Sequence, residues 1–251
     1  MAASSLTLFT TLSIMAVLVK AHPPGLMLTI VNNCPFPIWP AIQPNAGHPV
    51  LESGGFFLPS LSHRSFPAPA TPWSGRIWAR THCHSTSPSH LSCATGDCNS
   101  LLACSGHGGA PPATLAQFSL HHGGHNDFAS YGVSLVDGYN LPMTVTPHEG
   151  KGLCPVVGCR ADLLPACPPP LRLLFPAAHG AVVGCKSGCE AFKSDELCCR
   201  NHYNSPQTCK PSDYSKFFKH HCPATFTYAH DTPSLMHECS SPRELKVIFC
   251  H

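Results

Sequence analysis

Three cysteines, Cys93, Cys98 and Cys104, lie within twelve residues of this sequence. Thiols at this density serve either as zinc ligands or as disulfide partners, and the choice depends on the redox compartment. Between the first two, Gly96 and Asp97 are typical of a tight turn, because glycine accepts a positive φ and aspartate bonds its own backbone. Asp97 is therefore interpreted as a turn residue rather than as a catalyst.

A second group with possible chemistry is the histidine cluster His121, His122 and His125, since imidazole binds divalent metals. No acidic or further histidine partner stands at ligand spacing, so a solvated loop is favoured, and neither a metal nor a cofactor is expected. The sequence also lacks a Gly-x-Ser-x-Gly nucleophile motif and a phosphate-binding glycine loop.

Composition favours disulfides over zinc. The 251 residues include 16 Cys, 27 Pro and 19 Gly, and only 11% are charged. An even, large number of cysteines in a loop-rich chain is typical of secreted proteins. Composition leaves the pairing of these cysteines open. The net charge is +2, and no basic patch with interleaved aromatic residues is present, so nucleic acid is not an expected partner.

The amino terminus predicts secretion. Residues 6–19 form an apolar run that is too short for a comfortable membrane span. Val19 and Ala21 then stand at the −3 and −1 positions of a cleavage site. Residues 1–21 are therefore expected to be a signal peptide. No second long apolar run follows, so no stable membrane anchor is expected.

Short strand patterns separated by proline and glycine dominate the rest of the chain. Strands are expected at residues 26–33, 76–81, 114–120 and 244–250, and residues 133–140 and 142–147 read as a hairpin joined at Asp137-Gly138. Helices are expected over residues 185–192 and from Ser212 onward. This pattern favours an all-β sandwich with loops held by disulfides.

Several motifs carry a family resemblance. They are Ile-Val-Asn-Asn-Cys-Pro at 30–35, Gly-Arg-Ile-Trp-Ala-Arg-Thr at 75–81, Cys-x-Thr-Gly-Asp-Cys at 93–98, Pro-Pro-Ala-Thr-Leu-Ala at 111–116 and Val-Ser-Leu-Val-Asp-Gly-Tyr-Asn-Leu-Pro-Met at 133–143. With these motifs, the mature chain resembles the thaumatin-like proteins, the pathogenesis-related family 5 of plants.

The resemblance implies a mainly β fold: a flattened two-sheet β-sandwich with a disulfide-rich helical domain and a small disulfide-rich loop domain. The sandwich would comprise residues 22–82, 113–158 and 223–251, the loop domain residues 83–112, and the helical domain residues 159–222. The implied disulfides are Cys34–Cys250, Cys83–Cys93, Cys98–Cys104, Cys154–Cys239, Cys159–Cys222, Cys167–Cys185, Cys189–Cys198 and Cys199–Cys209. A monomer located in the apoplast or cell wall is expected.

Members of this family often carry an acidic cleft linked to β-1,3-glucans and antifungal action. Arg76, Asp137 and Asp231 match three of its positions. The family Glu is replaced by Gln117 and one family Asp by Gly132. An amide hydrogen-bonds a sugar but does not transfer a proton near neutral pH. Asp137 and Asp231 remain as weak candidates for catalysis, and Asp127 lies near the missing Asp but out of register.

Two structural alternatives stay open for these residues. Arg76 and Asp137 could form a buried ion pair, and Gln117 could be a satisfied polar residue on a half-buried strand. Alternation predicts that Gln117 points away from Ala116 and Phe118. On that basis Gln117→Glu is expected to keep the fold, and adding Gly132→Asp is expected to raise any glucan hydrolysis further.

The sequence therefore favours a secreted defence-type protein that binds β-1,3-glucan, a related cell-wall carbohydrate or a fungal surface in its cleft, with weak or no hydrolase activity. Because glycosidases need two carboxyl groups, an active endo-β-1,3-glucanase is the first alternative. A protein-binding or inhibitor module is the second.

Overall fold

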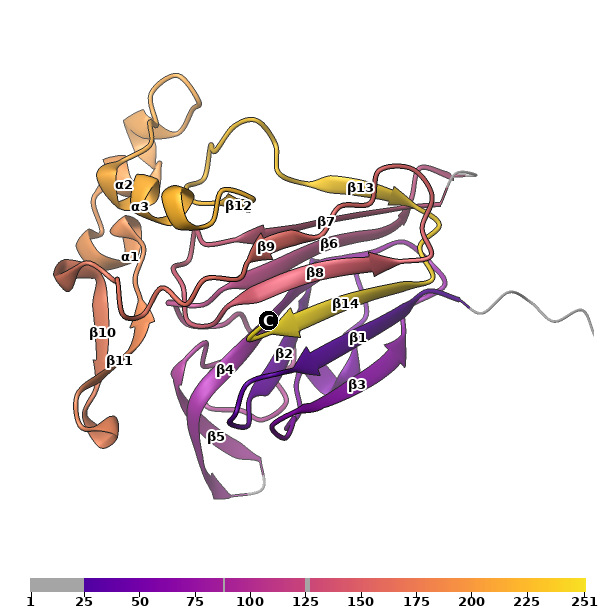
Figure 1. Ribbon diagram of the computed structural model, residues 1–251, viewed down its shortest axis with the longest axis horizontal. Coiled ribbons are helices and arrows are strands. Elements are labelled where there is room, and N and C mark those ends of the chain that lie inside the picture. Colours follow the sequence, from indigo (N-terminus) through magenta and orange to yellow (C-terminus); the bar gives the residue numbers. More distant parts are fainter. Residues whose placement is uncertain (1–24, 88, 125–126) are drawn as a thin grey trace, which may run out of the picture.

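The computed structural model describes residues 25–87, 89–124 and 127–251 of the chain (Figure 1). The signal peptide expected at residues 1–21 lies outside this part, as does His125 of the histidine cluster. Among the described residues, no helix has the length and apolar character needed to cross a membrane.

Two sheets form the body of the molecule. The five-stranded sheet has the order β3-β1-β14-β8-β9, with β1 at Met27–Asn32, β3 at Ser62–Pro67, β8 at Met143–His148, β9 at Val157–Cys159 and β14 at Glu244–Phe249. The seven-stranded sheet has the path β12-β7-β6-β4-β2, to which β13 adds beside β7 and β5 beside β4. Its strands are β2 Trp39–Pro44, β4 Trp73–Ser87, β5 His90–Thr95, β6 Leu115–His122, β7 Phe128–Ser134, β12 Thr225–Phe226 and β13 His237–Ser240.

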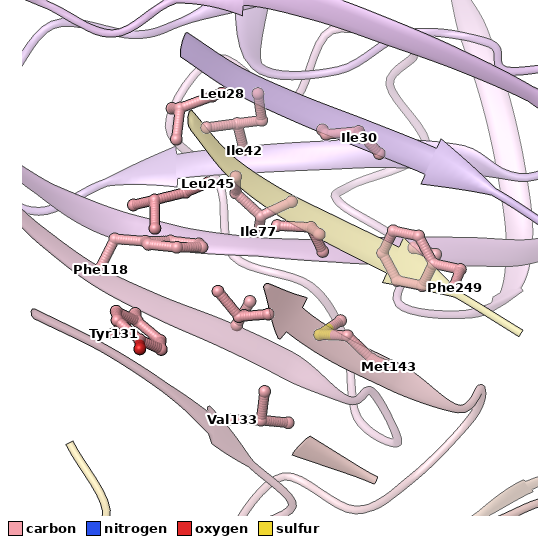
Figure 2. Packing of buried hydrophobic residues seen from close by; sticks show 14 of the residues in the cluster. Leu28, Ile30, Ile42, Ile77, Phe118, Tyr131, Val133, Met143, Leu245 and Phe249 are labelled. Carbon is pink, nitrogen blue, oxygen red and sulfur yellow. The ribbon is translucent and has the colours of Figure 1, made fainter. Parts of the chain in front are cut away.

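The two sheets pack face to face around one apolar core (Figure 2). Alternate residues of each strand point inward, as the period of two requires. Leu28, Ile30 and Leu245 come from one sheet, and Ile77 and Phe118 come from the other; none of the five is more than 3% exposed. Burial of each such side chain stabilises the fold by about 1.5–3 kcal/mol. The predicted mainly β sandwich is confirmed.

The helical part lies at one end of this sandwich (Figure 1). It consists of the ribbon formed by β10 (Arg172–Phe175) and β11 (Ala181–Cys185), together with α1 (Gly188–Phe192), α2 (Asp195–Cys198) and α3 (Asp213–His221). It has its own core, in which Leu135 and Tyr139 pack with Leu171 and Phe218. A third apolar cluster, around Trp78, Cys98 and Cys104, supports the disulfide-rich loops of residues 83–112, called the loop region below.

All sixteen cysteines are paired, in the eight disulfides that the family resemblance implies. Cys34–Cys250 follows directly on β1 and β14, which run parallel as neighbours from Met27↔Glu244 to Asn32↔Phe249. This disulfide spans a sequence separation of 216 residues. In the chain-entropy account, closing so long a loop stabilises the fold by more than about 4 kcal/mol.

The hairpin predicted over residues 133–147 is wrong. β7 and β8 belong to different sheets, and β8 pairs with β14 and β9. The turn itself exists, since Gly138 has φ +87° and its N–H donates to the Leu135 carbonyl at 2.9 Å. After it, however, Tyr139 exchanges two backbone hydrogen bonds of 2.7 and 2.8 Å with Cys185. These bonds direct the chain away from the seven-stranded sheet, to which β7 belongs, before it enters β8.

The helix predicted from residue 185 begins later. Cys185 ends β11, because its backbone is bonded to Tyr139, and α1 starts at Gly188. Ser187 caps α1 by accepting a hydrogen bond from Glu190 N–H. The helix predicted from Ser212 is confirmed as α3, where the Ser212 hydroxyl accepts from Ser215 N–H at 3.1 Å.

Candidate functional site

A row of three residues crosses the outer face of the seven-stranded sheet. In the antiparallel ladders Arg76 of β4 lies opposite Gln117 of β6, and Gln117 lies opposite Gly132 of β7. Gln117 faces outward because its neighbours Ala116 and Phe118 are 0% and 3% exposed in the sandwich core. This is the orientation that strand alternation predicts.

This row forms part of a groove with three adjoining pockets. The central pocket, of about 350 Å³, is lined by Arg76, Gln117, Asp137, Phe226 and Tyr228, among others. The strand-side pocket, of about 360 Å³, shares Arg76 and Gln117 and adds Asn45, Ser74 and Met236. The helix-side pocket, of about 210 Å³, shares Asp137 and Tyr228 and adds Glu190 of α1. Three of the predicted site residues, Arg76, Gln117 and Asp137, therefore meet in the central pocket.

Three polar side chains of the central pocket have no hydrogen-bond or ion-pair partner within the described ranges of the chain. Arg76, Gln117 and the Asp137 carboxylate make no side-chain hydrogen bond or ion pair with any other residue that the structure describes. Among these residues, the alternative of an Arg76–Asp137 ion pair is therefore not realised, nor is a satisfied Gln117. All three groups are half-buried, and their donors and acceptors are directed to solvent or to a ligand.

Asp137 retains its proton to a higher pH than an ordinary aspartate. Burial raises the pKa of its carboxyl group, the positive charge of Arg76 opposes this shift, and the negative charge of Glu190 adds to it. A carboxyl group with a raised pKa can act as a general acid. The pocket thus holds one carboxyl group of suitable chemistry.

Glu190 is a second acidic residue of the groove, and the sequence analysis missed it. It lies in the first turn of α1 and forms an ion pair with Lys193. The signal was present as Ser187-x-x-Glu190, the pattern of a capping box that begins a helix. Because the predicted helix began at residue 185, Glu190 fell in its middle, and the capping box at its true start was not recognised.

Asp231 lies apart from the other predicted site residues. Its carboxylate forms a 2.6 Å ion pair with Lys219 and accepts hydrogen bonds from Thr227 N–H at 2.9 Å and Thr227 hydroxyl at 3.0 Å. It lines a neighbouring pocket of about 470 Å³ that shares only Tyr228 with the central one. Burial and the Asp231 charge raise the pKa of Tyr228. These contacts give Asp231 a structural role: it holds Lys219 and Thr227 in place beside Tyr228.

A carboxylate side chain at position 132 would be crowded by its neighbours in the observed structure. A Cβ atom there would lie 2.8 Å from Met236 Sδ and 3.0 Å from the Leu235 carbonyl oxygen. This crowding argues against the expectation that Gly132→Asp restores a cleft acid, because the new side chain has to displace Met236. Asp127 does not replace it: its carboxylate bonds His121 Nδ1 at 2.7 Å, and it lines no pocket of the groove.

The remaining candidates have structural partners. His122 Nε2 bonds the Ser130 hydroxyl at 2.6 Å. Within the described ranges, no group of three or more histidine, cysteine or acidic side chains could hold a metal. Asp97 accepts from Cys93 N–H at 2.8 Å and Ser100 N–H at 2.7 Å, as expected of a turn residue.

Arg80 shares a strand face with Arg76 but is fully buried. Its guanidinium donates to the carbonyl oxygens of Leu101 at 2.6 Å and Leu102 at 2.9 Å, both in the loop region. Burial lowers the pKa of Arg80 to about 10, and the Asp97 charge opposes this shift. Arg80 therefore fixes the loop region against β4 and is not available to a ligand in the groove.

Comparisons with known proteins agree with this architecture. An osmotin-like protein of Solanum lycopersicum is 69% identical over 254 residues, which cover 100% of both chains. A protein of Prunus avium named glucan endo-1,3-beta-glucosidase is 40% identical over 224 residues, which cover 89% of each of the two chains. The crystal structure of a beta-1,3-glucanase domain (GH64) from Clostridium beijerinckii shares the fold, with a TM-score of 0.52 and 11% identity, over 90% of this chain and 98% of that one.

The family assignment rests on the match of nearly the whole described chain. Residues 32–251 match the Thaumatin family. This span includes both main sheets except the first residues of β1, all sixteen cysteines and every residue of the groove. The chain is therefore a member of the thaumatin family, whose plant representatives include the osmotin-like and pathogenesis-related proteins.

Proposed function

We propose that this protein is a secreted, defence-type member of its family that binds β-1,3-glucan or a related cell-wall carbohydrate in the groove, with weak or no hydrolase activity. The observation that carries the proposal is the central pocket. Arg76, Gln117 and Asp137 offer hydrogen-bonding groups there that no other described residue engages, next to the rings of Phe226 and Tyr228.

This combination suits a sugar. Pyranose hydroxyl groups both donate and accept, and the pocket supplies a guanidinium donor, a carboxylate acceptor and an amide that does both. The aromatic rings supply apolar faces for the C–H side of a sugar ring. The charges of Arg76 and Asp137 are opposite, which favours a neutral ligand over a strongly charged one.

Calorimetric titration with laminarihexaose tests the proposal, with cellohexaose as the comparison glucan. We expect Arg76→Ala and Gln117→Ala each to weaken laminarihexaose binding by about tenfold, because a hydrogen bond to a ligand contributes about 1–2 kcal/mol and 1.4 kcal/mol is a factor of ten. Arg160→Ala and Gln207→Ala alter exposed side chains elsewhere and should leave binding unchanged. Absence of laminarihexaose binding to the unmodified protein would refute the proposal.

A second candidate function, endo-β-1,3-glucanase activity, is favoured by the pair Asp137 and Glu190. Asp137 has a raised pKa, and Glu190 is a second carboxyl group whose charge acts on it. Glycosidases use two carboxyl groups about 5–10 Å apart. The named activity of the Prunus avium relative supports this candidate. Release of reducing ends from laminarin by purified protein, abolished in Asp137→Asn, would establish it over simple binding.

Secretion is part of the proposal. Eight disulfides form and persist in oxidising compartments, and the expected signal peptide would direct the chain there. The intact mass of protein recovered from extracellular fluid should correspond to cleavage after Ala21 with all thiols oxidised. Accumulation of a full-length, reduced protein inside cells would contradict secretion.

A further inference from the structure

Gly132 lies at a junction on the edge of the seven-stranded sheet. On one side of it β13 pairs with β7 as far as His237↔Tyr131, and on the other side β12 pairs with β7 at Thr225↔Val133. The chain between β12 and β13 loops away from the sheet and returns beside this point (Figure 1). Met236, the residue before β13, therefore lies next to Gly132.

Glycine is needed at position 132 for space. Its φ is not among the positive values of this backbone, so conformation alone does not demand glycine. A Cβ atom would approach Met236 Sδ to 2.8 Å, the Leu235 carbonyl oxygen to 3.0 Å and Phe226 Cε2 to 3.4 Å. The first separation is closer than packed atoms allow, and the second is tight enough that the Leu235 carbonyl would have to shift slightly. The missing side chain thus lets a thioether and an aromatic ring lie directly over the sheet.

This apolar pair runs alongside the polar row. Phe226 lines the central pocket and Met236 lines the strand-side pocket, whereas Arg76 and Gln117 line both. Tyr131 and Val133, which flank Gly132 in β7, are 0% exposed in the sandwich core, so Gly132 faces the groove. A ligand that spans the two pockets would meet hydrogen-bonding groups along one side and apolar atoms along the other.

We propose that Met236, seated over Gly132, forms with Phe226 the platform that contacts the C–H face of a neutral hexopyranose ring while Arg76 and Gln117 bond its hydroxyl groups. The inference rests on the proposed carbohydrate-binding function. It identifies Met236 as the residue that sets the orientation of the bound sugar ring. A thioether is polarizable and adapts its shape, which suits contact with C–H groups. A carboxylate at position 132 would instead present a charge to this face.

Methionine methyl NMR tests the contact directly. After the expected signal peptide the chain has three methionines, Met27, Met143 and Met236. Met143 is 0% exposed in the core, and Met27 is half-buried on the five-stranded sheet. In a titration of ¹³C-methyl-labelled protein with laminarihexaose, only the Met236 signal should shift, and it should saturate with the calorimetric Kd.

Variants separate the platform from the rest of the groove. Met236→Ala should weaken laminarihexaose binding about fivefold to tenfold, and Met236→Leu, which keeps the apolar contact, should stay within about twofold. Gly132→Ala should weaken binding similarly by displacing Met236, and the double variant should be no weaker than the weaker-binding single variant, since both changes act through one contact. Met27→Ala is the matched control and should bind as the unmodified protein does.

The outcomes distinguish this inference from the function on which it rests. Binding with an unmoved Met236 signal, or Met236→Ala binding as tightly as the unmodified protein, would overturn the platform and leave glucan binding intact. No laminarihexaose binding at all would overturn both. If Gly132→Ala does not fold, the comparison of Met236→Ala with Met236→Leu decides the question alone.

Discussion

Gln117 of β6 lies directly opposite Arg76 of β4, and the two side chains line the same two pockets of the groove. An amide beside a guanidinium carries no negative charge to offset it. The compensating charge in the central pocket is the Asp137 carboxylate, whose pKa burial raises and Arg76 lowers. This arrangement makes the groove a hydrogen-bonding site with a single carboxyl group in its central pocket.

Restoring a carboxylate at position 117 should therefore add acid chemistry. Gln117→Glu is a near-isosteric change of a half-buried side chain, so we expect a melting temperature within about 2 °C of the unmodified protein. Release of reducing ends from laminarin should increase, because the introduced carboxyl group and that of Asp137 would then form a pair. The exposed change Gln207→Glu is the control. An unmodified protein that already hydrolyses laminarin as fast as the variant would show that position 117 is not catalytic.

Adding Gly132→Asp should not help. The new side chain must displace Met236 and the Leu235 backbone, and overpacking of this kind costs about 1–3 kcal/mol. We expect a lower melting temperature and no further gain in laminarin hydrolysis over Gln117→Glu alone. A double variant that is both as stable and more active would show that the segment before β13 moves freely.

Asp137→Asn should stabilise the protein at neutral pH. Because burial raises the pKa of Asp137 in the folded state, folding favours the protonated form, and stability falls as pH rises above the ordinary value toward and through the folded one. The neutral amide removes this loss. Thermal unfolding should show a gain on the order of 1–3 °C at pH 7 that disappears near pH 3, where the carboxyl group is protonated in both states. A gain that is equal at both pH values would argue against a raised pKa.

Glu190→Gln should lower the pKa of Asp137. The charge of Glu190 contributes to the raised value, after burial, and the amide removes that charge. Carboxyl ¹³C NMR titration of Asp137 measures the shift directly. Glu196→Gln is the matched control, because Glu196 lines the same helix-side pocket but is not among the charges that act on Asp137. Equal shifts in both variants would mean that a general field, rather than Glu190, sets this pKa.

Asp231→Asn should affect stability more than binding. The variant loses the 2.6 Å ion pair with Lys219, although the Lys219 side chain is 33% exposed and solvent weakens the interaction. We expect a loss of about 1–3 kcal/mol and a laminarihexaose Kd within about twofold.

Asp213→Asn is the control for this prediction. It breaks an exposed ion pair with Lys216 and should lower the free energy of unfolding only slightly. If Asp231→Asn abolishes binding while the melting temperature is unchanged, Asp231 contacts the ligand after all.

Much of this structure follows from local sequence. The alternation of Ala116, Gln117 and Phe118 fixes which side chain leaves the core, since a strand offers only two faces. Ser212 followed by an amphipathic run marks the start of α3. The disulfide pairs, by contrast, came from the family resemblance, because cysteine spacing alone does not choose among pairings.

What the sequence did not reveal depends on contacts between distant segments. Tyr139 looked like the start of a returning strand, but its backbone pairs with Cys185, 46 residues later by their numbers. Met236 reaches Gly132 only because the loop between β12 and β13 rejoins β7 at that residue. The capping box at Ser187 marks the start of α1, but neither of these pairings leaves a periodic signal that would place Glu190 or Met236 in the groove.

The central claim is that the groove binds β-1,3-glucan, and a crystal structure of the protein with laminarihexaose tests it most directly. The account predicts sugar rings in the central and strand-side pockets, with hydroxyl groups within hydrogen-bond distance of Arg76 and Gln117 and a C–H face against Met236. An oligosaccharide bound elsewhere, such as on the outer face of the five-stranded sheet, or an empty groove at saturating laminarihexaose, would contradict it.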